Sequence, residues 1–368
     1  MNEPIYLDHN ATTPIRPEAL EAVTRVVAML GNPSSVHQFG RDVRRHIEDA
    51  REALAALVHA EPADVIFTSC GTEANNLALQ GVGRDRVFVS AVEHVSVLEA
   101  REGVIQIPVD ENGIVDCTAL EALLAEGTAP ALVSVMFANN ETGVLQPIED
   151  IAAIAKQHDA LVHCDAVQGA GKVPININAL GVDMVSLSSH KIGGPQGAGA
   201  LIVQDTVGLG AIIHGGGQER RHRGGTENAA SIAGFGVAAQ YAANCKDEAA
   251  RLGDLQQDLE VRARAVLSET QIFGEAVARL TNTTCLTMPN VSSETQVMAL
   301  DLAGVAVSAG AACSSGKVGA SHVLEAMGVG EAAGDAIRVS LGWTTTTDDI
   351  ERFISAWSAL FQRTLDPA

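Results

Sequence analysis

A lysine follows a serine-rich apolar run near the middle of the chain. Residues 186–203 have the sequence SLSSHKIGGPQGAGALIV, so that Lys191 stands between a strand-like pattern and a run of glycines. Such a lysine is either a surface residue at a turn or a reactive amine at the end of a sheet. Ligands of open α/β sheets bind beyond the carboxyl ends of the strands. The residue types at the other strand ends therefore decide between these two interpretations.

Polar side chains follow several of the apolar runs that we expect to form strands. Taken alone, each is more often a helix cap or a buried hydrogen-bonding group than a catalytic one. Together they place acids, amides, imidazoles and hydroxyls at one edge of a sheet, and a helix that begins at a glycine turn also offers N–H groups to an anion. These residues are Gly71, Thr72, Glu93, His94, Asn139, Asn140, Asp165, Gln168, Ser188, Ser189, His190 and Lys191.

One cofactor requires this combination of side chains. Pyridoxal phosphate is held as a Schiff base on a lysine, with an acidic partner at its pyridinium nitrogen. Lys191 suits the first role, Asp165 the second, and the flat imidazole of His94 suits the face of the ring. The groups suited to the phosphate are Thr72, Ser188 and His190. A P-loop and a GxGxxG sequence with its following acid are both absent from the sequence, so the usual nucleotide sites are not indicated.

The elements that position these residues follow from alternating short apolar runs and amphipathic stretches. Helical patterns at 72–82 and 148–158 lie between runs typical of strands. This alternation predicts an α/β fold with a mostly parallel sheet and helices on both faces. The strand-like runs occupy residues 64–69, 86–92, 104–110, 131–138, 161–167, 184–189 and 199–203.

The rest of the chain predicts a second, smaller unit. Residues 226–269 favour helix and contain few breakers, and a 368-residue chain is long enough for two domains. Beyond them lie strand-like patterns at 285–292, 305–310 and 336–342 and a final amphipathic helix. We predict a large cofactor-binding domain over residues 15–255. Residues 1–14 and 256–368 would form a small α+β domain that carries the segment around Cys313.

The composition of the chain argues against several kinds of binding partner and site. The formal net charge is −21 and the excess acid is scattered, which argues against nucleic acid as a partner. The sequence has no 18-residue apolar run and starts without a basic, apolar leader, so we expect no membrane segment and a cytoplasmic location. None of the six cysteines forms a CxxC pair, so a zinc site is not indicated and most should be reduced core residues.

Nearly the whole chain resembles the cysteine desulfurases of the NifS/IscS type, within the class V aminotransferase family. The resemblance runs from YLDHNATTP to IRVSLGWTTT and includes, in order, GNPSSVHQFGR, NNETGVLQPI, HCDAVQGAGKVPI, SSHKIGGPQGAGAL and GGGQERRHRGGTEN. It implies a pyridoxal-phosphate enzyme of fold type I, in which a mostly parallel sheet forms the large domain and a smaller α+β domain adjoins it. It also implies a homodimer as the active unit.

The resemblance assigns roles to individual residues. It implies that Lys191 carries the cofactor, that Asp165 faces the pyridinium nitrogen, that Gln168 contacts the ring hydroxyl and that His94 covers the ring. Asn140 would contact the cofactor and the substrate L-cysteine, whose carboxylate Arg338 would bind. A buried ion pair is the alternative interpretation of Arg338. The implied phosphate ligands are Gly71, Thr72, Ser188 and His190, together with Thr226 of the other subunit.

The type of reaction depends on residues 307–321, VSAGAACSSGKVGAS. Small residues dominate this stretch, so we expect it to be mobile and Cys313 to be accessible. The resemblance implies that the Cys313 thiolate, assisted by His94 or a nearby cation, takes sulfur from L-cysteine and releases L-alanine. The resulting persulfide would pass to an acceptor protein such as an iron–sulfur scaffold. An inert thiol is the alternative, and a transient role of Cys313 as a cluster ligand stays open, with no other metal site indicated.

Two departures from the family pattern stand out. Cys70 replaces the usual glycine before the phosphate turn, and Gly319-Ala320 replaces a Glu-Pro pair. Other functions remain open at this point. A selenocysteine lyase would use the same residues, and a transaminase would have no use for Cys313. An inactive scaffold would only bind iron–sulfur assembly partners.

Overall fold

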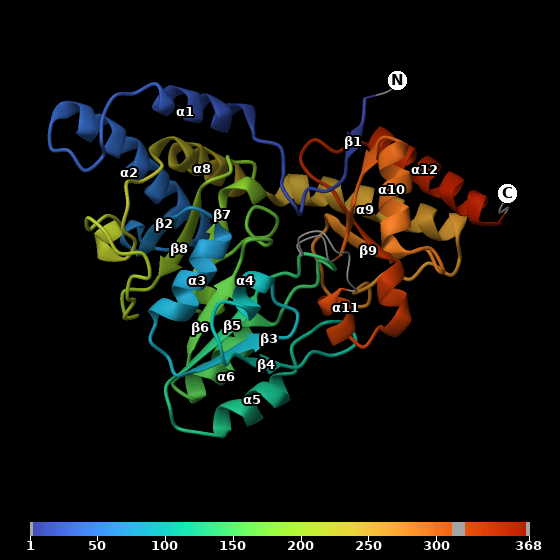
Figure 1. Ribbon diagram of the computed structural model, residues 1–368, viewed down its shortest axis with the longest axis horizontal. Coiled ribbons are helices and arrows are strands. Elements are labelled where there is room, and N and C mark those ends of the chain that lie inside the picture. The colour runs from blue at the N-terminus through green and yellow to red at the C-terminus, as the bar shows by residue number, and fades with distance from the viewer. Residues whose placement is uncertain (1–2, 311–320, 366–368) are drawn as a thin grey trace.

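The computed structural model describes residues 3–310 and 321–365. Its central sheet has seven strands in the order β2-β8-β7-β6-β5-β3-β4 (Figure 1). β4, β3, β5, β6 and β7 run parallel, and β8 is antiparallel to both of its neighbours. The mostly parallel α/β sheet is thus confirmed, and each strand falls within one of the seven predicted runs. The strands are β2 Val65–Thr68, β3 Arg86–Ser90, β4 Ile105–Ile107, β5 Ala131–Met136, β6 Leu161–Asp165, β7 Met184–Ser188 and β8 Gly199–Val203.

Helices cover both faces of this sheet, which explains its nearly continuous apolar strands. Successive strand residues point to opposite faces, so Val65 and Phe67 join one apolar layer and Ile66 joins the other. The first layer receives α1 Pro17–Val27, α2 Gln38–Val58, α5 Cys117–Ala125, α6 Ile148–Gln157, α7 Ile177–Leu180 and α8 Ala229–Ala242. The second layer receives α3 Gly71–Gly81 and α4 Val95–Leu98.

The smaller α+β part, on the right of Figure 1, has its own apolar core. β9 (Thr283–Thr287), β11 (Ser308–Ala309) and β12 (Ala336–Ser340) form an antiparallel sheet with the order β11-β12-β9. Its helices are α9 Lys246–Val266, α10 Ser293–Leu302, α11 His322–Ala326 and α12 Thr347–Leu365. The short 3-10 helices of the described chain are η1 Pro62–Asp64, η2 Ser189–Lys191, η3 Glu219–Arg221 and η4 Gly330–Asp335.

The N-terminal segment connects the two parts. β1 (Ile5–Tyr6) pairs in parallel with β10 (Val305–Ala306) of the smaller part, and Asp8 bridges to Ser340. The chain then crosses to the large sheet, where the Thr13 N–H donates to the His190 carbonyl at 3.0 Å. This crossing brings residues 8–13 to the end of β7.

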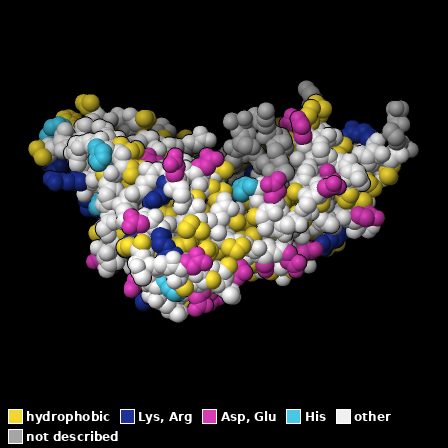
Figure 2. All heavy atoms as spheres, turned by 60° about the horizontal axis from the view of Figure 1, so that its bottom comes forward, with side chains coloured by type: hydrophobic (Ala, Val, Ile, Leu, Met, Phe, Trp, Pro, Cys, Tyr) yellow, Lys and Arg dark blue, Asp and Glu magenta, His cyan; other side chains and the backbone are white. Residues whose placement is uncertain are grey.

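The outer surface bears mainly acidic charge. Figure 2 shows acidic side chains spread over the visible face rather than gathered in one patch. No helix in the described part of the chain is long and apolar enough to cross a membrane.

Candidate active site

A cavity of about 410 Å³ lies at the carboxyl ends of β6 and β7, beside the N-terminal crossing segment. It is lined by side chains from both parts of the chain. The structure therefore brings together residues that lie far apart in sequence. The predicted site residues that line it are Gly71, Thr72, His94, Asn140, Asp165, Gln168, Ser188, His190, Lys191 and Arg338.

Asp165 is the last residue of β6 and is almost fully buried. Its Oδ1 accepts the Val167 N–H at 2.9 Å, and its Oδ2 accepts the Asn75 side-chain amide at 2.7 Å. Two neutral donors thus orient the Asp165 carboxylate. Among the described residues it forms no ion pair. A carboxylate held in this way is suited to a protonated ring nitrogen.

Lys191 lies at the end of η2, directly after β7. Its Nζ donates to the backbone carbonyl of Ala11 at 2.8 Å and also to that of Asn10. Both acceptors belong to the N-terminal crossing segment. The amine is therefore placed at the junction of the two parts and at the wall of the cavity.

His94 caps the N-terminus of α4 and lies over the same cavity. Its Nδ1 accepts the Ser96 N–H at 3.1 Å, so the neutral ring carries its proton on Nε2. Burial lowers the pKa of His94, and the charges of Lys191 and His322 lower it further, whereas Asp165 opposes them. The result is a neutral, flat ring suited to stacking on an aromatic cofactor.

The start of α3 and the end of β7 form a small polar recess. The Oγ of Ser188 is buried and has no hydrogen-bond partner among the described residues. A Cβ at Gly71 would lie 2.9 Å from Val167 Cγ2 and 3.4 Å from Ser188 Cβ, so this close approach requires glycine. With an unpaired buried hydroxyl beside a helix N-terminus, the recess fits the phosphate of pyridoxal phosphate.

His190 stands beside this recess. Its Nδ1 lies 3.2 Å from Thr12 Oγ1, and burial, aided by the charge of Lys191, lowers its pKa to about 4. The neutral ring can donate one N–H to an anion. Cys70 also lines the cavity, so this departure from the family pattern places a half-buried thiol next to the recess.

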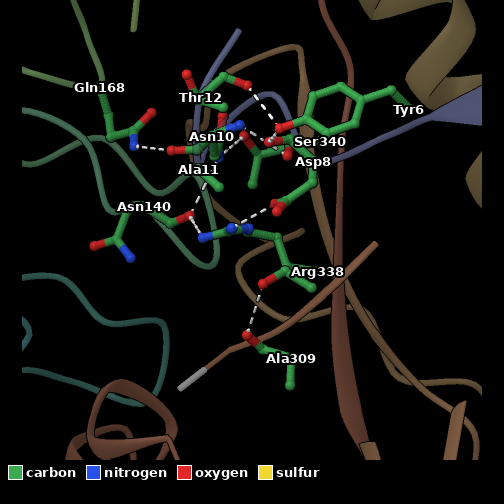
Figure 3. A network of polar contacts seen from close by, with 12 residues as sticks. Tyr6, Asp8, Asn10, Ala11, Thr12, Asn140, Gln168, Ala309, Arg338 and Ser340 are labelled. Atoms are coloured by element: carbon green, nitrogen blue, oxygen red, sulfur yellow. Dashed lines mark hydrogen bonds and ion pairs between the residues drawn. The ribbon is translucent and has the colours of Figure 1, made fainter. Parts of the chain in front are cut away.

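Figure 3 shows how Gln168 and Arg338 are held. Gln168 Nε2 donates to the Asn10 carbonyl at 2.9 Å. Arg338 pairs with Asp8 Oδ1 at 2.7 Å through Nη2 and donates to the Asn140 carbonyl at 3.0 Å through Nη1. The structure therefore places Arg338 in a buried ion pair, which was the alternative interpretation of this residue. Its Nε is buried and donates to no described acceptor.

Two strand-end residues serve the scaffold rather than the cavity. Glu93 is fully buried and accepts the Met136 N–H at 2.6 Å, and burial raises its pKa well above the usual value. Asn139 accepts the N–H groups of Glu141 and Thr142 at 2.9 and 3.0 Å. Glu93 thus connects the end of β3 to the end of β5, and Asn139 shapes the turn that follows β5.

Sequence reasoning missed four residues of this network: Asp8, Asn10, Asn75 and Lys172. Asn10 and Asp8 lie in the N-terminal motif YLDHNATTP, residues 6–14, whose position near the N-terminus gave no indication of contact with residue 191. Asn75 lies one turn into α3, so a helical repeat from Gly71 could have identified it.

Two predicted residues are not part of the described cavity. Thr226 is exposed and lies outside the lining. Cys313 lies outside the described residues, as do Gly319 and Ala320. The described cysteines are unpaired: Cys164, Cys245 and Cys285 are buried, and Cys70 and Cys117 are half-buried, so not all of them are core residues.

Comparison with known proteins gives consistent matches over the full chain. The family described as Aminotransferase class-V matches residues 5–353. The chain is 40% identical to cysteine desulfurase IscS of Dictyoglomus turgidum, covering 100% of this chain and 97% of that protein. It is 43% identical to a cysteine desulfurase of Cereibacter sphaeroides, with 96% and 94% covered.

Solved structures agree with these matches. A NifS-like protein from Rickettsia africae superposes with a TM-score of 0.92 at 40% identity, covering 98% of this chain and 100% of that one. A second structure, of SspA in complex with cysteine, superposes with a TM-score of 0.78 at 31% identity, covering 91% and 98%.

Proposed function

The chain belongs to the class V aminotransferase family and is a cysteine desulfurase that depends on pyridoxal phosphate, and we propose that it stores the sulfur of L-cysteine as a persulfide on Cys313. The observation that supports the cofactor roles most strongly is the single cavity that joins Lys191, Asp165 and the unpaired Ser188 hydroxyl.

Pyridoxal phosphate supplies an electron sink for negative charge on the carbon next to the substrate's amino group. In our proposal the Asp165 carboxylate favours a proton on the ring nitrogen, and Lys191 anchors the group. The released Lys191 amine then takes the proton from the substrate carbon and returns it. The neutral His94 ring would cover the bound cofactor, with its Nε2–H available as a donor.

Cys313 acts after these proton transfers. Its thiolate attacks the substrate sulfur, so an S–S bond forms while the carbon–sulfur bond breaks. The electron pair of the broken bond stays on the substrate carbon, which takes up a proton and leaves as L-alanine. The sulfur remains on Cys313 as a persulfide, so no external oxidant is needed.

We propose that an acceptor protein, such as an iron–sulfur scaffold, then removes this sulfur. A cytoplasmic location suits such a transfer, since the described cysteines are unpaired and thiols stay reduced in that compartment.

We also propose a homodimer in which Thr226 reaches the partner's phosphate. Two observations support it: Thr226 is exposed outside its own cavity, and Oε2 of the adjacent Glu227 is buried without a described partner. In addition, Leu30 and Val36 between α1 and α2 are 79% and 87% exposed, and a partner subunit would give these apolar side chains a surface to pack against.

Replacement of Cys313 tests the sulfur-transfer role. Cys313→Ala should bind pyridoxal phosphate and stay yellow, and L-cysteine should still change its visible spectrum, because Lys191 and Asp165 are intact. Alanine formation should fall by about a thousandfold or more, as for the loss of other nucleophiles. Alanine is measured by chromatography under excess reductant.

Cys117→Ala is the matched control, because this half-buried thiol lies on α5 away from the cavity. It should retain the wild-type rate. Alanine formation by Cys313→Ala at the wild-type rate would contradict the proposal. Retained activity on selenocysteine alone would instead favour a selenocysteine lyase.

A further inference from the structure

Lys172 is a second lysine beside Lys191 that the proposed reaction does not use. It lies in the turn after β6, four residues beyond Gln168. Its Nζ donates to Gln168 Oε1 at 2.8 Å and to Asn10 Oδ1 at 3.0 Å. No carboxylate forms an ion pair with Lys172 within residues 3–310 and 321–365.

The surroundings of Lys172 suit an amine without charge. Burial lowers the pKa of Lys172 well below its usual value, and the charges of Lys191 and Arg338 lower it further. A neutral amine has two N–H groups, and the two acceptors, Asn10 Oδ1 and Gln168 Oε1, use both of them. Lys172 can therefore remain buried without a counter-ion.

The two acceptors of Lys172, Gln168 and Asn10, both line the proposed cofactor site. Gln168 turns its Nε2 toward the Asn10 carbonyl, and the same carbonyl accepts from Lys191. Asn10 Oδ1 has a second donor in Asn282 Nδ2 at 3.1 Å. For Gln168 Oε1, Lys172 is the only donor in the described part of the chain.

We propose that Lys172 is a positioning residue that fixes the direction of the Gln168 amide, so that an N–H donor faces the ring hydroxyl of the cofactor. This inference rests on the contact with the ring hydroxyl that the family resemblance implies for Gln168, and so on the proposed cofactor site. Without the Lys172 amine, the buried Oε1 of Gln168 accepts no hydrogen bond. The side chain then turns Oε1 toward the cavity, where water can donate, and presents an acceptor to the ring instead.

Lys172→Met tests this role, because methionine keeps most of the volume and removes both N–H groups. Apoprotein is titrated with pyridoxal phosphate, and the dissociation constant and the visible absorption maximum are measured. We expect binding to weaken about tenfold, the effect of one hydrogen bond, and the absorption maximum to shift. The matched control, Lys156→Met on the exposed face of α6, should change neither quantity.

A double-mutant cycle separates action through Gln168 from a general effect on the fold. Gln168→Leu should produce the same shift and the same weakening, and adding Lys172→Met to it should cause no further change. Additive effects would overturn the proposal. So would a Lys172→Met protein with wild-type binding and spectrum.

The cycle also distinguishes this proposal from the proposed function. If Gln168→Leu leaves the spectrum and binding unchanged, both the Gln168 role and the Lys172 role are wrong, whereas the alanine assay on Cys313→Ala still decides the desulfurase reaction. If Lys172→Met does not give folded apoprotein by circular dichroism, Lys172→Leu replaces it. Leucine likewise has no N–H donor on its side chain, so the same shift is expected and an unchanged spectrum overturns the proposal.

Discussion

Arg338 is paired with Asp8 in the structure, and we propose that the substrate carboxylate is its second partner. Its Nη2 lies 2.7 Å from Asp8 Oδ1, and the two side chains are 4% and 19% exposed. A substrate carboxylate that binds the same guanidinium must replace or share Asp8. The ion pair therefore keeps a buried cation neutralised before substrate arrives, and it competes with the substrate afterwards.

Asp8→Asn should reveal this competition. The neutral amide still accepts a hydrogen bond from Arg338 but no longer neutralises it, so the substrate carboxylate faces a weaker competitor. We expect the KM for L-cysteine to fall severalfold while kcat changes less, and the protein to lose about 1–3 kcal/mol of stability because a buried cation loses its counter-ion. Steady-state kinetics and urea denaturation measure both effects.

The matched control for this change is Asp258→Asn. It removes the 3.4 Å surface pair with Arg262 and should alter stability by less than about 0.5 kcal/mol, with KM unchanged. A KM for Asp8→Asn that equals or exceeds the wild-type value would show that Arg338 does not exchange Asp8 for substrate.

The sequence predicted half of the residues that line the cavity. Lys191, Asp165 and His94 each lie within two residues of the end of an apolar run, so their place at the carboxyl edge of a parallel sheet follows from local pattern alone. Asn10 and Lys172 could not be found in this way. Their roles depend on a contact between the N-terminal crossing segment and a turn more than 150 residues away, as the Lys172–Asn10 hydrogen bond shows.

The elements that the sequence predicted best are the strands whose side chains are buried on both faces of the sheet. The strands of the large sheet are buried on both faces and appear as apolar runs. The helix-forming segment 226–269 instead forms two helices, because the chain leaves α8 at Ala243 and restarts at Lys246. The run 305–310 likewise divides into β10 and β11, which pair with different strands. Such breaks are set by tertiary pairing.

A histidine within the sheet makes the stability of the fold depend on pH. His163 in β6 is fully buried, with Nδ1 2.8 Å from Ser134 Oγ on β5 and Nε2 2.8 Å from Ser186 Oγ on β7. Burial lowers its pKa to about 4, against a small opposing effect of Asp165. As the pH falls, His163 of the unfolded chain binds a proton near pH 6.5. In the folded protein it binds that proton only near pH 4.

The free energy of unfolding should therefore fall as the pH drops from about 6.5 to about 4. His163 alone contributes about 3 kcal/mol to this loss. The His163→Val protein should be less stable at pH 7, because two serine hydroxyls lose their partner. Its free energy of unfolding should fall by about 3 kcal/mol less than that of the wild type between pH 6.5 and pH 4. Urea denaturation at several pH values measures both.

His214→Val serves as the control, because His214 lies exposed in a loop. Its pH profile should match that of the wild type. His9 and His190, whose pKa values are also lowered to about 4 by burial, contribute to the remaining slope. An unchanged slope in His163→Val would mean that His163 is protonated in the folded sheet.

At the scale of the whole molecule, two apolar cores explain why the chain has two parts. Ile5 and Leu7 pack with Leu252 and residues beyond it, so the N-terminus belongs to the core of the smaller part. The continuous helix α9 (Lys246–Val266) passes through the proposed boundary near residue 255. The division into 15–255 and 1–14 with 256–368 stays a prediction, which limited proteolysis would test.

The homodimer proposal predicts complementation between inactive subunits. Lys191→Ala removes the amine that anchors the cofactor within its own subunit. Thr226→Asp places a negative charge against the phosphate held by the partner. Each homodimer should be inactive, but a mixed dimer contains one site with both Lys191 and Thr226 intact. Mixing after subunit exchange should therefore restore alanine formation to one site per mixed dimer.

A second mixture provides the control for this experiment. Lys191 and Asp165 line the same cavity of one subunit, so mixing Lys191→Ala with Asp165→Asn leaves every site of the mixed dimer with one defect. This mixture should stay inactive. Subunit exchange is verified in both mixtures by native mass spectrometry with one isotope-labelled chain. If exchange occurs and neither mixture recovers activity, Thr226 does not complete the partner's site. Recovery in both mixtures would show that the defects are not confined to single sites, and the shared-site arrangement would again be wrong.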